Sequence, residues 1–431
     1  MGKCIEVREF DSITENHDFK NDEKYKYVEP EIFQCLKEFI EKFSVDDESS
    51  DIEDFMKISY KRNIGSIISV KNYVGVIQMK NGTQIQVLPK INFGTIEDEH
   101  NKQTKRIFLN MLKSMREFPG KIFNNSHLKV EHMNLYEIFI SMYLQELRKL
   151  VKSGIKSSYI NYEDNHNFFK GKLLINQHIK KNFIHKEKFY VTYEEYHPNR
   201  PENKLIKSTL LKLQSLSTSA VNFKEIRQLL SIFDIVQPSL NYSLDFSKVQ
   251  IDRNTKDYQM LMKWSRVFLF DKSFSTFSGE TSTRALLFPM ERVFESYISK
   301  QIKKILLPDG WQVSTQDKGH YLFTKPKECF ALKPDIVCER DGRKIIIDTK
   351  WKNIDKSEKK NLGISQSDMY QMYAYSKKYQ TSDVWLIYPI NDKMRGHSDI
   401  IFESGDGTIV RVYFVDLENI DKSIEILKNK L

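Results

Sequence analysis

The sequence predicts an α+β protein of several domains: a small β-rich N-terminal domain, a largely helical middle, and a C-terminal α/β domain whose mixed central sheet is flanked by helices. The chain has 431 residues, more than one hydrophobic core usually serves. Short β-rich runs gather before residue 100, whereas helical periodicity dominates from 102 to 264. Beyond residue 285, helical and strand patterns alternate, which favours an α/β arrangement.

The N-terminal domain is predicted over residues 1–100. A helix at Glu31–Phe43 precedes an acidic loop, and three strand candidates follow it: Ile64–Val70, Tyr73–Met79 and Thr83–Pro89. Asn81-Gly82 suits a two-residue turn between the last two strands. Gly75 interrupts one strand, which indicates either a bulge or a close approach of another backbone.

The middle region is predicted over residues 101–272. Its helix candidates are Lys105–Phe118, Leu135–Val151, Asn203–Leu216, Phe223–Phe233 and Thr255–Phe268, with a few short strands between them. The segments Lys149–Lys156 and Lys170–Lys188 are rich in lysine. Solvated helix faces and a groove facing DNA both remain open interpretations of these clusters.

The C-terminal domain is predicted over residues 283–431, after a boundary of small polar residues at Ser273–Ser282. Helices are expected at Ala285–Ile305, Ser365–Lys378 and Leu417–Lys428. Strands are expected near Trp311–Ser314, Tyr321–Thr324, Pro334–Glu339, Lys344–Thr349, Val384–Tyr388 and Thr408–Phe414.

Composition limits the class of protein without identifying it. Lys and Arg exceed Asp and Glu by 67 to 58, a balance compatible with a polyanionic partner or with solubility alone. The four cysteines form no zinc or disulfide pattern, which indicates reduced thiols. No apolar run is long enough for a membrane span or a signal peptide, so we expect a cytoplasmic protein.

The segment LKPDIVCERDGRKIIIDTKWK, Leu332–Lys352, carries the most chemistry. Asp341-Gly342 suits a two-residue hairpin turn, and a turn there places Asp335 directly opposite Asp348. Opposed residues have Cβ atoms about 4.5–5.5 Å apart on one face of the sheet. Lys350 shares that face, because it lies two residues after Asp348.

Two carboxylates at this separation repel each other unless a cation lies between them, and oxygen ligands favour a hard ion such as Mg²⁺. A nearby lysine could steady the attacking water or the charge that develops on a phosphate. These are the parts of metal-assisted phosphodiester hydrolysis. The alternative is an ordinary surface hairpin, since D-x-K occurs by chance in a chain with 29% charged residues.

Two helices supply further candidates. Glu295 lies among apolar neighbours in the helix that begins near Pro289 and could be a third carboxylate, or it could belong to a solvated acidic face. Gln371 and Tyr375 are four residues apart on the helix after the hairpin, so they share a face. Together they could hold a phosphate or orient a water, although such aromatic content also suits core packing.

These residues resemble the PD-(D/E)XK nuclease superfamily. Pro334-Asp335 is similar to its PD and Asp348-Thr349-Lys350 to its (D/E)XK, while Gln371–Tyr375 is similar to the QxxxY helix of the branch typified by the RecB nuclease domain. The resemblance implies that Asp335, Asp348 and Glu295 bind Mg²⁺, that Lys350 serves catalysis, and that Gln371 and Tyr375 support the site. It implies a PD-(D/E)XK core for the C-terminal domain.

Most of the chain resembles the McrC family, the nuclease subunits of McrBC-type, 5-methylcytosine-specific restriction systems. The similar segments, in order, are Val74–Ile91, Gly154–Tyr159, Phe169–Leu173, Tyr193–Tyr196, Glu202–Lys207 and Leu286–Ile298, ending in the nuclease motif. The resemblance implies a role in phage defence, with double-stranded, modified DNA as substrate. It also implies a McrB-like AAA+ GTPase as partner, whose hydrolysis the chain stimulates.

The chain contains no G-x-x-x-x-G-K-[ST], so an NTP-driven step must be powered by another chain. Following the resemblance, the candidate docking elements are the hairpin at Asn81-Gly82 and the strand Ile64–Val70, with Lys61 and Arg62 as contacts. Two other functions stay open: a nuclease component that recognises an unmodified sequence, and a non-catalytic adaptor that regulates an AAA+ ring.

Overall fold

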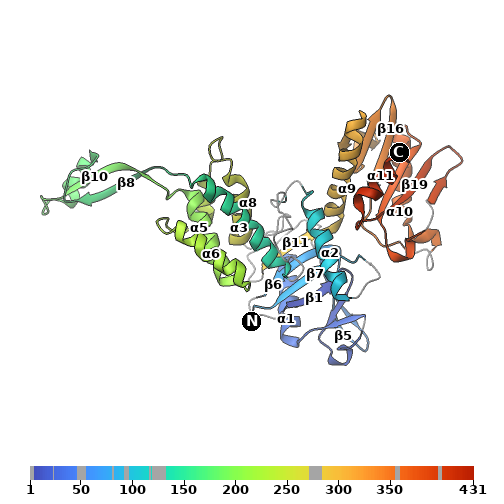
Figure 1. The fold of residues 1–431 in the computed structure, drawn as a ribbon, viewed down its shortest axis with the longest axis horizontal. Coiled ribbons are helices and arrows are strands. Elements are labelled where there is room, and N and C mark those ends of the chain that lie inside the picture. The colour runs from blue at the N-terminus through green and yellow to red at the C-terminus, as the bar shows by residue number, and fades with distance from the viewer. Residues whose placement is uncertain are drawn as a thin grey trace. The chain divides into compact units, whose positions relative to one another are not determined.

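The computed structural model describes residues 4–22, 24–45, 55–79, 82–91, 97–115, 118, 133–270, 284–354, 360–396 and 400–431 (Figure 1). The chain divides into two compact units. One consists of Tyr136–Lys272, and the other joins Gly2–Leu135 to Ser273–Leu431. The N- and C-terminal parts of the chain therefore belong to the same unit, and the middle region is inserted between them.

The N-terminal part of the larger unit contains two four-stranded sheets. One has the order β1-β7-β6-β11 and the other the order β3-β2-β5-β4. The strands are β1 (Cys4–Arg8), β2 (Ser12–Thr14), β3 (Tyr25–Tyr27), β4 (Met56–Lys61), β5 (Gly65–Val70), β6 (Tyr73–Gln78), β7 (Gln84–Leu88) and β11 (Arg284–Pro289). Helix α1 (Pro30–Val45) contacts β4, and helix α2 (Glu97–Leu112) contacts β7. The helix and strands that the sequence predicts before residue 90 are confirmed.

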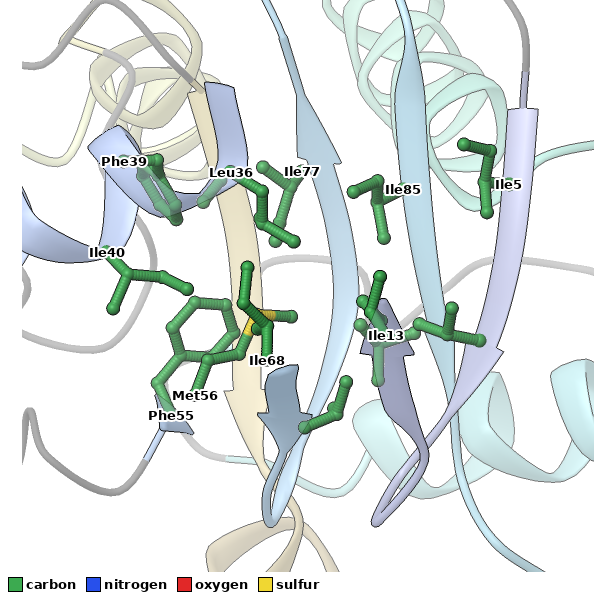
Figure 2. Close-up of a cluster of buried hydrophobic side chains, with 14 of the residues drawn as sticks. Ile5, Ile13, Leu36, Phe39, Ile40, Phe55, Met56, Ile68, Ile77 and Ile85 are labelled. Carbon is green, nitrogen blue, oxygen red and sulfur yellow. The ribbon is translucent and has the colours of Figure 1, made fainter. Parts of the chain in front are cut away.

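One hydrophobic core fills the N-terminal part. Ile77 and Ile85 of the first sheet, Ile68 of the second, and Leu36 and Phe39 of α1 all point into it (Figure 2). Helix α1 has apolar residues at helical spacing, which places them on one face, and the strands direct apolar side chains toward that face. These side chains therefore pack together in one cluster.

Strand β11 differs from the prediction, which placed a helix over Ala285–Ile305. Residues 284–289 pair antiparallel with β6, and the helix α9 (Met290–Leu306) begins only after Pro289. Gly75 explains this pairing. A Cβ at Gly75 would lie 1.9 Å from the backbone oxygen of Leu286, so only glycine permits this approach. Of the two interpretations of Gly75, close backbone approach is the correct one.

The C-terminal part contains a six-stranded mixed sheet in the order β12-β15-β16-β17-β19-β18. Its strands are β12 (Gln312–Thr315), β15 (Ile336–Arg340), β16 (Arg343–Thr349), β17 (Asp383–Pro389), β18 (Ile400–Glu403) and β19 (Ile409–Val415). Helices α9, α10 (Gln366–Tyr379) and α11 (Ile420–Lys428) pack against it, and β13 (His320–Phe323) and β14 (Cys329–Leu332) form a separate hairpin. The predicted mixed sheet with flanking helices is confirmed, whereas β14 and β18 were not predicted.

The smaller unit is a set of helices that carries a long β-hairpin. The helices are α3 (Leu135–Ser153, of which Tyr136 onward lies in this unit), α5 (Pro201–Leu216), α6 (Ala220–Ile232), α7 (Tyr242–Lys248) and α8 (Tyr258–Phe270). Strands β8 (Ser158–His166) and β10 (Phe189–His197) pair over nine residues, and β9 (Lys172–Leu173) and α4 (Ile175–Lys181) complete its outer end. In Figure 1 this hairpin extends away from the helices of its own unit.

Several predictions fall on residues outside the described ranges. These are the acidic loop after α1, Asn81 of the predicted turn, and the boundary segment Ser273–Ser282. The domain limits at 100 and 283 stay predictions. All four cysteines are free, as expected. Across the described residues, no helix combines the length and the apolar character that crossing a membrane requires.

Candidate active site

The hairpin of β15 and β16 carries the predicted carboxylates. Its register pairs Arg340 with Arg343 and Ile336 with Ile347, as the sequence predicts. Asp341 and Gly342 both have positive φ, which is the backbone conformation of a type I′ turn. Asp335 immediately precedes β15 and Asp348 lies at the end of β16, so the two carboxylates meet at the same end of the hairpin.

Asp335 is held by the strand that faces it. Its Oδ2 accepts hydrogen bonds from the backbone N–H and the hydroxyl of Thr349, both at 2.7 Å. Two donors on one oxygen fix the carboxylate in one orientation. The middle residue of the D-x-K motif is therefore part of the site, although the sequence alone gave it no role.

Asp348 begins a chain of polar contacts. Its Oδ2 lies 2.7 Å from Nζ of Lys350, the Lys350 ammonium donates to Oε1 of Gln371 at 3.0 Å, and the Gln371 amide donates to the Tyr375 hydroxyl at 2.7 Å. The lysine is thus fixed at both ends, by β16 and by α10. Its backbone N–H also donates to Ile387 of β17 at 2.9 Å, so the whole segment is rigid.

Glu295 reaches the site from α9. Its Oε1 accepts from the side-chain amide of Gln316 at 2.6 Å, and the backbone N–H of Gln316 donates to the carbonyl of Asp335 at 3.1 Å. Gln316 therefore links Glu295 to the start of β15. The structure brings all six predicted site residues into one region. Four of them, Asp348, Lys350, Gln371 and Tyr375, contact one another in sequence. Asp335 joins them through Thr349, and Glu295 joins through Gln316.

The electrostatics of the site favour a cation. Burial raises the pKa of Asp335, and burial together with Asp335 raises the pKa of Asp348 and of Glu295. Burial opposes the charge of Lys350, but Asp348 and Asp335 raise its pKa overall, so the ammonium stays charged. One half-buried ammonium faces three carboxyls whose negative charges repel one another, so binding of a further cation would lower that repulsion.

The residues fit a magnesium ion. Asp348 Oδ2 is buried and receives no hydrogen bond of regular geometry from the described residues, despite its ion pair with Lys350. Within the described residues, no group of three or more His, Cys, Asp or Glu is arranged to hold a metal. Mg²⁺ needs only one or two carboxylates, since water and phosphate oxygens complete its shell. Asp335 and Asp348 can supply these two, and Glu295 stands outside that pair.

Besides Thr349 and Gln316, further neighbouring side chains were missed by sequence reasoning. Asp368 of α10 is buried and forms an ion pair with Lys352 at 2.9 Å. Trp351, directly after the D-x-K motif, donates from Nε1 to both oxygens of Glu9, at 3.2 and 3.0 Å. The ring of Trp351 also packs on Phe294, next to Glu295. Trp351 lies two residues after β16, and a large aromatic residue directly after D-x-K was the available signal.

The predicted docking contacts lie at the turn between β4 and β5. Lys61 is the last residue of β4, and both Lys61 and Arg62 are exposed. The Lys61 ammonium donates to the Tyr25 hydroxyl at 3.4 Å. The ammonium also lies 5.5 Å from the centroid of the Tyr25 ring, and both positions are accessible to a partner.

A second exposed surface lies on the long hairpin of β8 and β10. Large apolar side chains are exposed at its base, Tyr159 and Tyr196, and at its outer end, Phe168, Phe169, Ile175, Ile179, Phe183 and Ile184. The segment Lys170–Lys188 occupies its outer end and includes only one short helix, so it is not mainly a solvated helix face. A cluster of exposed apolar side chains in one segment is typical of an interaction site.

Comparisons with known proteins bear on the whole chain. No curated protein matches it. A refined half-complex from a tetradecameric assembly of Thermococcus gammatolerans McrB AAA+ hexamers with bound McrC matches with a TM-score of 0.71 and 19% identity, over 100% of both chains. A cryo-EM structure of the Thermococcus gammatolerans McrBC complex matches with a TM-score of 0.47 and 19% identity, over 69% of this chain and 86% of that chain. At such identities only the first match is informative, and it concerns the fold.

The family comparison is stronger than the structural ones. The model of the McrBC 5-methylcytosine restriction system component matches residues 68–389. This range includes β6, β7 and β11 of the first N-terminal sheet, the whole inserted unit and the carboxylate hairpin, and it begins within β5 of the second sheet. The chain therefore belongs to the family of McrBC 5-methylcytosine restriction system components.

Proposed function

We propose that this chain is the Mg²⁺-dependent endonuclease subunit of an NTP-dependent restriction system, with a PD-(D/E)XK core. The observation that carries the proposal is the meeting of Asp335 and Asp348 at one end of a register-locked hairpin, with Lys350 fixed beside them. Family membership supports the restriction system as its setting. Intact carboxylates and lysine disfavour a purely regulatory adaptor.

The chain's own residues divide the chemistry between them. Asp335 and Asp348 would hold the magnesium ion, which supplies positive charge to the phosphate oxygens when it is bound. Lys350 presents an ammonium to the charge that builds up on the phosphate in the transition state. Gln371 and Tyr375 keep that ammonium directed at the site, and Thr349 keeps the Asp335 carboxylate in place.

The partner proposal rests on a different observation. The structure of similar fold contains McrB AAA+ hexamers with bound McrC, and we infer a McrB-like AAA+ GTPase as the partner of this chain. Two surfaces are candidates for docking. One is the β4–β5 turn with Lys61 and Arg62, and the other is the exposed apolar surface of the long hairpin.

Cleavage of a plasmid tests the catalytic proposal. The chain is combined with its NTPase partner, GTP and Mg²⁺, and methylated and unmethylated plasmids are compared. We expect Asp348→Ala to abolish cutting while stimulation of the partner's hydrolysis is retained. Glu339→Gln is the matched control, since Glu339 is an exposed carboxylate on the same hairpin. Unchanged cleavage by Asp348→Ala would overturn the site.

Stimulation of the partner's GTP hydrolysis separates the two docking candidates. Lys61→Glu with Arg62→Glu tests the turn, and Phe183→Ser with Ile184→Ser tests the long hairpin, where both side chains are exposed. Loss of stimulation in one pair and not in the other identifies the docking surface. If neither pair affects stimulation or complex formation, both candidates are wrong.

A further inference from the structure

The hairpin of β13 and β14 lies between two elements of the candidate active site. It follows Gln316, which contacts both Glu295 and Asp335, and it ends two residues before Pro334-Asp335. Its strands pair His320 with Leu332 and Phe323 with Cys329. We call the segment Lys318–Lys333 the aromatic arm. The chain therefore leaves the site, forms the arm, and returns directly to a catalytic carboxylate.

Helix α10 holds the base of the arm. The Tyr379 hydroxyl donates to Oδ2 of Asp317 at 2.7 Å, and the ring of His320 lies 4.1 Å from that of Tyr379. The backbone N–H of Lys333 contacts the Tyr375 hydroxyl, the same group that orients Gln371. The base of the arm is thus fixed by the helix that also fixes Lys350.

The outer part of the arm is exposed and aromatic. Phe330 is 71% exposed and Phe323 is 55% exposed, and their rings meet edge to face at 6.0 Å. Phe330 also has a φ of 58°, a left-handed conformation that costs a bulky residue free energy. Two large exposed rings, one on a strained backbone, form a surface whose burial would release free energy.

The charge of the arm identifies the class of partner. Its four lysines, Lys318, Lys325, Lys327 and Lys333, are exposed, and Glu328 is its one carboxylate. A positively charged, aromatic tip suits a duplex, whose phosphates bind lysine and whose groove edges accept an apolar wedge. An apolar protein surface would gain nothing from this excess of lysine.

We propose that the aromatic arm contacts double-stranded DNA beside the phosphate to be cut. Its lysines bind phosphates, and Phe323 and Phe330 insert as a wedge between base steps from the groove, which partly unstacks them. The arm sets the position of the duplex because its base shares α10 with Lys350. This inference rests on the proposed nuclease function, since it names how the same site holds its substrate.

Salt-dependent DNA binding tests the lysines. A labelled duplex is titrated with the full chain carrying Asp348→Ala, so that no cutting interferes, and the arm substitutions Lys325→Gln and Lys327→Gln are added together. We expect about a tenfold loss of affinity and a salt dependence lower by about two phosphate contacts. The control is Lys422→Gln, an exposed lysine of α11. Equal affinity and equal salt dependence in arm variant and control would overturn the proposal.

Base unstacking tests the aromatic pair. A duplex with 2-aminopurine near the cut position should brighten on binding, and Phe323→Ser with Phe330→Ser should remove that signal and slow cleavage in the otherwise unchanged chain. Ile401→Ser, at an exposed apolar position of β18, is the control, and thermal melting verifies folding. If the double variant instead loses partner stimulation with DNA binding intact, the arm contacts protein and the proposal fails.

The two proposals fail in different ways. If the unsubstituted chain with its partner cuts DNA while the arm variants bind and cut like their controls, only the arm assignment is wrong. If the unsubstituted chain with its partner and Mg²⁺ neither binds nor cuts DNA, the nuclease function is wrong and the arm assignment with it.

Discussion

Two hairpins of this chain use the same antiparallel pairing and present opposite surfaces. In the carboxylate hairpin of β15 and β16, Ile345, Ile346 and Ile347 are fully buried, and the polar groups at its end contact one another. The long hairpin of β8 and β10 exposes aromatic and aliphatic side chains at its outer end, among them Phe168, Phe183 and Ile184. The antiparallel backbone pairing therefore does not determine what either hairpin does. Side-chain burial distinguishes a hairpin that holds a reacting group from one that is available to a partner.

Matched lysines give the largest expected contrast between the hairpins. The Lys350 side chain is 20% exposed and lies against the buried Asp348, whereas the Lys170 side chain is 40% exposed and pairs with the solvent-accessible Glu195 at 3.1 Å. We expect Lys350→Met to lower the rate of DNA cleavage by about a thousandfold, as loss of one preorganised transition-state contact does. Lys170→Met should leave the rate, measured with saturating partner, within about twofold of the original. Similar losses of cleavage rate in both variants would show that the two lysines do not differ in their role in cleavage.

Matched isoleucines test the same contrast in stability. Ile346→Ala removes a side chain with no exposed surface and should lower the free energy of unfolding by about 2–5 kcal/mol. Ile184→Ala removes one that is 84% exposed and should change it by less than about 0.5 kcal/mol. Denaturant unfolding of the full chain measures both. A large loss for Ile184→Ala would mean that the long hairpin is packed against something in solution.

The pH dependence of stability tests the link between the N-terminal sheet and the carboxylate hairpin. Burial raises the pKa of Glu9 to about 8, although Trp351 and Lys90 lower it. The folded state therefore binds a proton that the unfolded state releases near pH 4.5. Stability should fall as the pH rises from about 5 to 8, and Glu9→Gln should flatten that dependence. Thermal melting at a series of pH values measures this dependence. If the melting temperatures of Glu9→Gln and of the unsubstituted chain change equally with pH, the assignment to Glu9 is wrong.

The smallest expected effect comes from the end of the polar chain. Tyr375→Phe keeps the buried ring and removes the hydroxyl that accepts from Gln371. Lys350 retains its contacts with Asp348 and Gln371, so we expect cleavage to slow only about threefold, in the range of one neutral hydrogen bond. A loss as large as that of Lys350→Met, measured in the same assay, would give Tyr375 a direct role in the reaction.

The carboxylate hairpin was predictable because its information is local. A two-residue turn fixes the register, and the register brings Asp335 and Asp348 to the same end of the hairpin. The helix with Gln371 and Tyr375 was predictable from periodicity for the same reason. Contacts such as Glu9 with Trp351 were not, because they join residues far apart in the sequence. The helix over Ala285–Pro289 was wrong because β6 captures that segment as a strand.

Strand β11 has a consequence for the order in which the protein folds. It pairs Arg284 with Gln78, so the first N-terminal sheet lacks its fourth strand until the chain beyond residue 289 has been synthesised. The inserted unit of Tyr136–Lys272 is complete earlier. Because domains fold as units during synthesis and distant pairings form slowly, the middle of this chain should fold before its beginning does. The helix that carries Glu295 then reaches its place only when the sheet closes.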